Sequence, residues 1–180
     1  MVDWNGVDAA GGAIFNASGT LTVQDSVLSH NAADNAVGGA VVNGDKATCT
    51  DGELSDNFAG RDGGAVQNEG VLAVVGGLVV DDRAVLGGGG IDDEGSATLT
   101  RVKVKADSAG GVGGGIRDRK ESGPTALTLH HGTVADDTAA VDGGGVFNDA
   151  GAGVALDDSR VVNDRPDDCV PLNTVPGCAD

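Results

Sequence analysis

The chain has 180 residues, of which 39% are apolar, 22% charged and 2% aromatic, and it contains 32 glycines but only 4 prolines. Alternating Val, Leu, Ile and Ala residues indicate that a core is buried, so we expect one folded domain and not a disordered low-complexity chain. The 28 acidic and 11 basic residues give a formal charge of −17, which argues against nucleic acid and anionic membrane surfaces as partners.

No segment has the pattern of a membrane span or of a secretion signal. The longest apolar stretch, residues 71–80, is interrupted by Gly76 and Gly77 and is far shorter than the ~20 residues that a membrane helix needs. The residues after Met1 carry neither a basic segment nor an apolar run. We therefore expect neither element in this sequence.

A glycine-pair motif, Gly-Gly-Ala/Gly-Ile/Val-x-Asn/Asp, recurs through the whole sequence at spacings of 25 to 30 residues. Self-similarity at a nearly fixed period is the signature of a repeat protein in which each copy forms one coil. The six copies begin at Gly11, Gly38, Gly63, Gly88, Gly113 and Gly143.

Within each copy apolar and polar residues alternate, as in Leu21-Thr22-Val23 and Leu127-Thr128-Leu129, which is typical of strands. When the copies are aligned on the motif, four columns stay apolar and a fifth stays small. The columns are Ile14/Val41/Val66/Ile91/Ile116/Val146, Leu21/Ala47/Leu72/Ala97/Leu127/Val154, Val23/Cys49/Val74/Leu99/Leu129/Leu156, Leu28/Leu54/Val79/Val104/Val134/Val161 and Ala33/Ala59/Ala84/Ala109/Ala139.

A single coil cannot bury these columns, because nothing lies above or below it, so stacking must supply the core. Coils laid in register at ~4.8 Å turn each column into an interior stack. The prediction is an all-β parallel β-helix of about six 25-residue coils with three short parallel sheets. We expect it to span residues 1–165, to begin partway through a coil, and to be followed by a cap or tail at residues 166–180.

Glycine pairs fit tight corners, where the chain needs positive φ or the absence of a Cβ, and Asn or Asp fits the next corner. A second polar column supports this assignment. We expect its amide members to lie inside the turn and its Asp members, which cannot stack while all are ionised, to face water or a cation. The ladder is Asn5, Asn31, Asn57, Asp82, Asp107, Asp137 and Asp164.

The motif, followed by Gly-Thr-Leu-Thr-Val-x-x-Ser and Leu-Ser-x-Asn, resembles right-handed parallel β-helix proteins of the pectin-lyase-like superfamily. It is most similar to repeat passengers of bacterial surface and polymorphic outer-membrane-type proteins. The tail from Pro166 to Cys178 is similar to the end of secreted β-helix repeat proteins of actinobacteria. The resemblance runs from about Val2 to Asp164 and implies a fold more than an activity.

Cys169 and Cys178 bracket a loop short enough to be closed by a disulfide, and the open end of a solenoid needs a cover. We expect a disulfide-closed cap, which implies an oxidising, extracellular compartment; two free thiols in a frayed tail are the alternative. Cys49 belongs to an apolar column and is expected to act as a small hydrophobe.

Four other patterns have both a structural and a functional interpretation, and we favour the structural one for each. His130 and His131 are expected to be exposed and to point to opposite faces. Arg101, Lys103 and Lys105 form a basic strip, where the superfamily's lyases would place a proton abstractor beside calcium. Threonine pairs such as Thr20-x-Thr22 resemble ice-binding ranks. The acidic pairs are interpreted as solvated turns, with shared calcium as the alternative: Asp81-Asp82, Asp92-Asp93, Asp136-Asp137 and Asp157-Asp158.

The nearly loopless coils and the scarcity of aromatic residues favour a non-catalytic, extracellular or cell-surface structural and interaction module without a cofactor. We expect a protein or cell-wall partner, and a monomer or end-to-end association. The alternatives are a polysaccharide lyase or hydrolase, or a fragment of one, and an ice- or mineral-binding solenoid.

Overall fold

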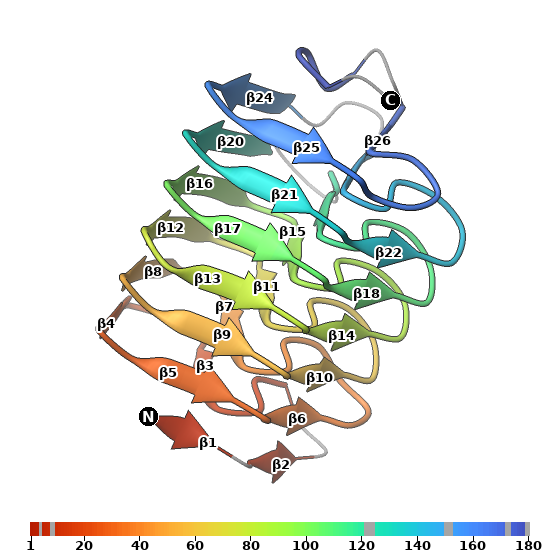
Figure 1. Cartoon of the computed structure of the whole chain (residues 1–180). Helices are drawn as coiled ribbons and strands as arrows, with labels where there is room; N and C mark the ends of the chain where they lie inside the picture. Colours follow the sequence, from red (N-terminus) through yellow and green to blue (C-terminus); the bar gives the residue numbers. More distant parts are fainter. Residues whose placement is uncertain (4, 8–9, 121–124, 150–152, 172–173, 179–180) are drawn as a thin grey trace.

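The structure is a computed structural model that describes residues 1–3, 5–7, 10–120, 125–149, 153–171 and 174–178 (Figure 1). Trp4 and residues 121–124 lie outside these ranges. The described chain is all β: 26 strands form four parallel sheets in a β-solenoid of about six coils, which confirms the predicted fold class. No helix in these ranges is long and apolar enough to cross a membrane.

Two of the sheets, A and B, meet at one corner of every coil (Figure 1). Sheet A is formed by β1 (Val2–Asp3), β5 (Val27–Ser29), β9 (Glu53–Ser55), β13 (Leu78–Val80), β17 (Lys103–Lys105), β21 (Thr133–Ala135) and β25 (Arg160–Val162). Sheet B is formed by β2 (Gly6–Val7), β6 (Ala32–Ala33), β10 (Phe58–Ala59), β14 (Arg83–Ala84), β18 (Ser108–Ala109) and β22 (Thr138–Ala139).

The other two sheets, C and D, complete the coil. Sheet C is formed by β3 (Ile14–Asn16), β7 (Val41–Asn43), β11 (Val66–Asn68), β15 (Ile91–Asp93), β19 (Ile116–Asp118), β23 (Val146–Asn148) and β26 (Cys169–Val170). Sheet D is formed by β4 (Thr20–Gln24), β8 (Lys46–Thr50), β12 (Val71–Val75), β16 (Ser96–Thr100), β20 (Ala126–His130) and β24 (Gly153–Asp157).

The number of sheets differs from the three that the sequence predicts. Sheet B is the additional one, and its strands contain the column of small residues. Each strand of sheet B has only two residues and begins two residues after a corner. It is therefore too short to show the alternation of apolar and polar residues that identifies a strand in the sequence.

The strand register confirms the aligned columns. Leu72, for example, pairs with Ala47 on one side and Ala97 on the other, and Val79 pairs with Leu54 and Val104. From the second coil onward the interior members of the columns are almost completely buried, except for the partly buried Leu156 in the last coil, and they form one continuous core. At the first coil, Val2 pairs with Leu28 and continues the sheet A column as predicted.

The glycine pair makes the corner before sheet C, and its two members have different roles. The first glycine adopts positive φ in all six copies, as at Gly63 with φ of 67°. The second approaches the next coil so closely that a Cβ on Gly64 would overlap the carbonyl oxygen of Gly89. Both parts of the expectation are therefore confirmed, because this corner requires both left-handed backbone and the absence of a side chain.

Two further corners also use left-handed backbone, but mostly with Asp, Asn or His. Residues after sheet D such as Asp25 and Asp51, and residues after sheet A such as His30 and Asp56, have φ between 47° and 55°. Asn, Asp and His tolerate this region better than other non-glycine residues do. Much of the unusual Asp content therefore follows from the backbone conformation of these corners.

The C-terminal end is covered by residues 166–171 and 174–178, in which β26 continues the stack. Cys169 pairs with Val146 in sheet C and is joined by a disulfide to Cys178, with 6.3 Å between their Cα atoms. Val175 is buried against the core. The predicted disulfide is confirmed, and Cys49 is a free, buried cysteine whose pKa burial raises to about 11.

Replacing Leu72 by Ala should destabilise the solenoid by about 2–5 kcal/mol, because it leaves a cavity in the middle of a column whose neighbouring coils cannot collapse independently. Thr98→Ala on the same sheet is the control, since Thr98 is exposed on the outer face. Denaturant unfolding followed by circular dichroism measures both. Equal losses for the two variants would contradict the placement of Leu72 in the core.

Thiol counting on the denatured, unreduced protein should find one free thiol per chain, from Cys49. Reducing the disulfide should lower the free energy of unfolding by about 2–3 kcal/mol, because the bridge restrains a short loop. The effect should appear as faster proteolysis near the C-terminus. Three free thiols, or protection unchanged by reduction, would contradict a stabilising cap.

Candidate functional site

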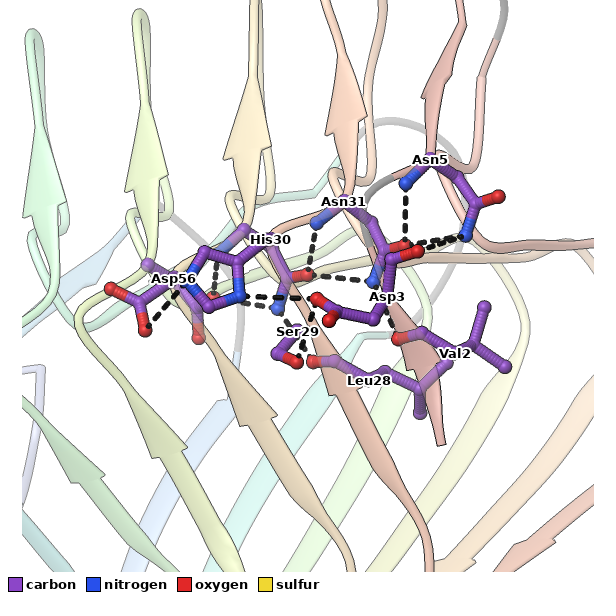
Figure 2. A network of polar contacts seen from close by, with 10 residues as sticks. Val2, Asp3, Asn5, Leu28, Ser29, His30, Asn31 and Asp56 are labelled. Atoms are coloured by element: carbon purple, nitrogen blue, oxygen red, sulfur yellow. Dashed lines mark hydrogen bonds and ion pairs between the residues drawn. The ribbon is translucent and has the colours of Figure 1, made fainter.

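The predicted polar column is a ladder of side chains inside the corner between sheets A and B, which we call the corner ladder. In its N-terminal half, each amide group bonds to the next coil. Asn5 Nδ2 donates to Asn31 Oδ1 at 2.8 Å, and Asn31 Nδ2 donates to Asn57 Oδ1 at 3.1 Å (Figure 2). Each Asn Oδ1 also accepts the backbone N–H of the preceding rung, so Asn31 and Asn57 stabilise both the corner and the stacking.

The aspartates of the corner ladder do not face water or a cation, contrary to expectation. Asp82, Asp107 and Asp137 are at most 1% exposed, and Asp164 is 7% exposed. Each Oδ1 accepts the backbone N–H of the preceding rung at 2.7 Å, and each Oδ2 is buried without a hydrogen-bond partner. At this corner the backbone N–H needs an acceptor that points into the interior. Asp supplies that oxygen in the same position as Asn does, but it lacks the N–H donor of the Asn side chain.

Burial raises the pKa values of these carboxyl groups, since a charged carboxylate is disfavoured away from water. The pKa rises to about 8 for Asp82 and Asp137 and to about 7 for Asp164, and the pKa of Asp107 lies well above its usual range. Repulsion between neighbouring rungs adds to the effect. Asp82, Asp107 and Asp137 are therefore largely uncharged acids near neutral pH, and Asp164 is about half ionised.

A second ladder lies at the corner between sheets C and D and is formed by the last residue of the motif. Asn16, Asn43 and Asn68 each donate Nδ2 to the next rung, at 2.8, 2.7 and 2.6 Å, the last bond reaching Asp93 Oδ1. Burial raises the pKa of Asp93 to about 6 and of Asp118 to about 7. Sequence alignment identified this column only as a corner, although its Asn-to-Asp change parallels the first ladder.

A cluster of charged side chains lies on the outer face of sheet C, and sequence reasoning did not assemble it. Arg117 on β19 bonds to Asp92 on β15 (Nε to Oδ1, 2.5 Å) and to Asp62 in the loop before β11 (Oδ1, 2.8 Å). Arg119 bonds to Asp92 Oδ2 at 3.1 Å and to Glu94. The sequence did contain a signal for this cluster: the variable fifth position of the motif is Asp92 in one copy and Arg117 in the next.

The side chains of this arginine–carboxylate cluster are largely inaccessible to solvent. The side chain of Asp92 is 0% exposed, that of Asp62 5% and that of Arg117 12%. Burial raises the pKa of Asp92 and the two guanidinium groups oppose that shift, while the carboxylates raise the pKa of Arg117. The cluster therefore joins three coils and offers little reactive surface to a substrate.

The residues considered for lyase chemistry or metal binding are not assembled into one site. Lys103 and Lys105 are exposed on sheet A, and Lys105 Nζ lies 3.5 Å from Asp136 Oδ2. His130 and His131 are partly exposed, as predicted, and each has its own aspartate: Asp157 at 2.9 Å and Asp158 at 3.7 Å. These are surface pairs, which contribute little energy.

Ser29, His30 and Asp3 lie close together at the first coils, but their bonding differs from that of a nucleophilic triad. The Ser29 hydroxyl donates to Asp3 Oδ1 at 3.1 Å, and His30 Nδ1 lies 3.1 Å from the same oxygen (Figure 2). A triad requires the serine to bond to the histidine. Here His30 lies between Asp3 and Asp56 of the coils on either side, which is a stacking arrangement.

The acidic pairs do not share one register. Two belong to the corner ladder, one to sheet C and one to the corner after sheet D. The interpretation as solvated turns is wrong for Asp82, Asp92, Asp93 and Asp137, which are buried. Among the residues that the structure describes, no group of three or more His, Cys, Asp or Glu side chains is arranged to hold a metal ion.

The threonine pairs of the sequence do not stack on one another from coil to coil. Thr22 pairs with Thr48, and Thr98 pairs with Thr128, with Ala73 interrupting the central file. Thr20 instead pairs with Lys46, and Thr50 with Gln24. The outer face of sheet D therefore carries one broken threonine file and not the double rank that the sequence resembles.

Comparison with known proteins gives no match to a family model, to a curated protein or to a solved structure.

Replacing Arg117 by Ala should destabilise the protein by about 3–5 kcal/mol, because it leaves Asp92 and Asp62 buried with less compensating charge. Arg83→Ala is the matched control, since Arg83 is exposed on sheet B. Thermal or denaturant unfolding at pH 7 measures the difference. A loss no greater than that of the control would contradict a cohesive role for the cluster.

Proposed function

We propose that this chain is a non-catalytic structural and interaction module, a rigid β-solenoid that works outside the cell or on the cell surface. The proposal rests on the observation that the polar groups that could take part in catalysis already bond to one another within the protein. Most of the carboxyl and amide groups of the two ladders are buried, the guanidinium groups of the arginine–carboxylate cluster are partly buried, and most of these groups bond to a neighbouring coil. An enzyme instead needs polar groups that converge on an accessible cleft.

A surface hollow at the corner after sheet D does not suit an acidic glycan. It has a volume of about 400 Å³. Its charged lining residues are Asp25, Asp51 and Glu53, all acids. A polyanionic chain would be repelled there, and the repulsion is reinforced by the −17 charge of the whole molecule.

The proposed location rests on the disulfide between Cys169 and Cys178, because such bonds persist in oxidising compartments. The glycine-pair motif supports a relationship with the right-handed β-helix proteins of the pectin-lyase-like superfamily. We propose a protein or cell-wall partner, which would meet the exposed outer faces of the sheets, and a monomeric or end-to-end-associated state.

The first test is enzymatic. Purified protein should release no unsaturated oligosaccharides from pectate or related acidic glycans, with or without calcium, as followed by ultraviolet absorbance. Calcium-dependent release that is abolished by Lys103→Ala or Arg101→Ala, but not by Arg83→Ala, would overturn the proposal in favour of a lyase.

The second test concerns binding. Saturable retention on isolated cell-wall material or on a surface protein, without turnover, would support the module. Sedimentation at several concentrations separates a monomer from end-to-end association. Absence of retention on every cell-wall and surface-protein preparation would contradict an interaction role.

A further inference from the structure

The corner ladder changes its chemistry halfway along the solenoid. The first three rungs are Asn, and the rungs from Asp82 onward are Asp, although the backbone arrangement is the same throughout. Asn57 Nδ2 uses its hydrogen atoms on Asp82 Oδ1 and on the carbonyl oxygen of Leu28, at 2.9 and 3.0 Å. An ionised Asp has no hydrogen atom to offer at the equivalent position, whereas a protonated one has.

The surroundings of the Asp rungs offer no buried cation to compensate for a charge. Glycine lies next to the carboxyl group of a rung, and no side chain separates them: a methyl group on Gly115 would lie only 2.6 Å from Asp137 Oδ2. The charged groups nearest to the rungs are mostly acids, Asp56, Asp81, Asp136 and Asp168, together with adjacent rungs. Among the described residues, the cations beside these corners are exposed: Arg83 follows Asp82 on sheet B, Lys105 is paired with Asp136, and Arg165 lies at the last corner.

We propose that the Asp half of the corner ladder is a pH-sensitive clamp, which holds the C-terminal coils together while its carboxyl groups are protonated and loosens those coils alone when they ionise. The geometry supports this directly. Oδ2 of Asp82, Asp107 and Asp137 is fully enclosed and unpartnered, so ionising it leaves a buried charge that only local opening can hydrate.

The direction follows from linkage. Each folded rung binds its proton more tightly than an unfolded Asp does, because burial raises the pKa from an ordinary value near 4 to about 8 at Asp82 and Asp137 and about 7 at Asp164, and raises that of Asp107 well above its usual range. The stabilisation is complete below about pH 4, decreases as pH rises, and is lost above about pH 8. Within this window local opening should increase about tenfold per pH unit for each proton released.

Hydrogen–deuterium exchange at pH 6 and pH 8 tests the clamp, since surface carboxylates are ionised at both values. Histidine is the residue type whose charge ordinarily changes in this range, and burial raises the pKa of Asp93 to about 6 and of Asp118 to about 7 in the second ladder. The measurement therefore uses a background variant that lacks these groups (His30→Asn, His130→Gln, His131→Asn, Asp93→Asn and Asp118→Asn), which is the parent chain of the comparisons below, with the unmodified chain in parallel. After correction for intrinsic exchange, opening at β17, β21 and β25 should increase at least about tenfold at pH 8. Opening at β5 and β9 should change by less than about twofold.

The double variant Asp107→Asn, Asp137→Asn should reduce the pH response by about half on a logarithmic scale, because two of the four ionising rungs become amides that can donate as Asn57 does. Asp81→Asn, Asp136→Asn is the matched control. It changes the same number of carboxyl groups to amides in the same segment, but at exposed corner positions whose φ of 56° and 61° suits Asn equally well.

Two outcomes would overturn the proposal: an equal response to pH in both halves of the solenoid, or an unchanged response in the double variant. A response lost equally in the control variant would assign it to surface charge and would also overturn the proposal. If the double variant does not fold, the half-by-half comparison in the parent chain decides the matter by itself.

Discussion

Each coil of this solenoid is held in shape by the coil that lies in register against it. No coil contains a core of its own, because its inward residues come from strands of two to five residues that enclose a single layer. Parallel backbone hydrogen bonds and the apolar columns supply cohesion between coils. Every other feature must preserve that register, including the corners, the ladders and the cap.

The corners show how this constraint selects residues. The corner before sheet C brings backbones together so closely that only glycine fits, whereas the corners after sheets A and D accept Asp, Asn or His in left-handed backbone. Inside two corners a side-chain oxygen must accept an N–H from the preceding coil or bond to its neighbouring rung. Asn meets this need completely, and Asp meets it with one oxygen while burying the other.

The same constraint bears on function. Arginines and carboxylates meet on the outer face of sheet C, but Asp92 is inaccessible and bonded to Arg117 and Arg119 of the next coil. The polar groups of this cluster and of the two ladders bond mostly from one coil to the next. The proposed module rests on how these polar groups are buried and bonded, and the proposed clamp rests on the protonation of the Asp rungs.

The sequence by itself determined the period, the parallel strands, the apolar columns, the glycine corners and the pairing of Cys169 with Cys178. All of these features except the disulfide repeat along the chain, so alignment of one copy with the next reveals them, and the short spacing of the two cysteines indicates the disulfide. Only the tertiary structure decided how deeply the Asp rungs are buried, that sheet B exists, and that Arg117 meets Asp62. Those properties depend on which side of a corner faces inward and on contacts between residues that are 55 positions apart in sequence. Residue type alone does not encode them, because an Asp at a turn is usually solvated.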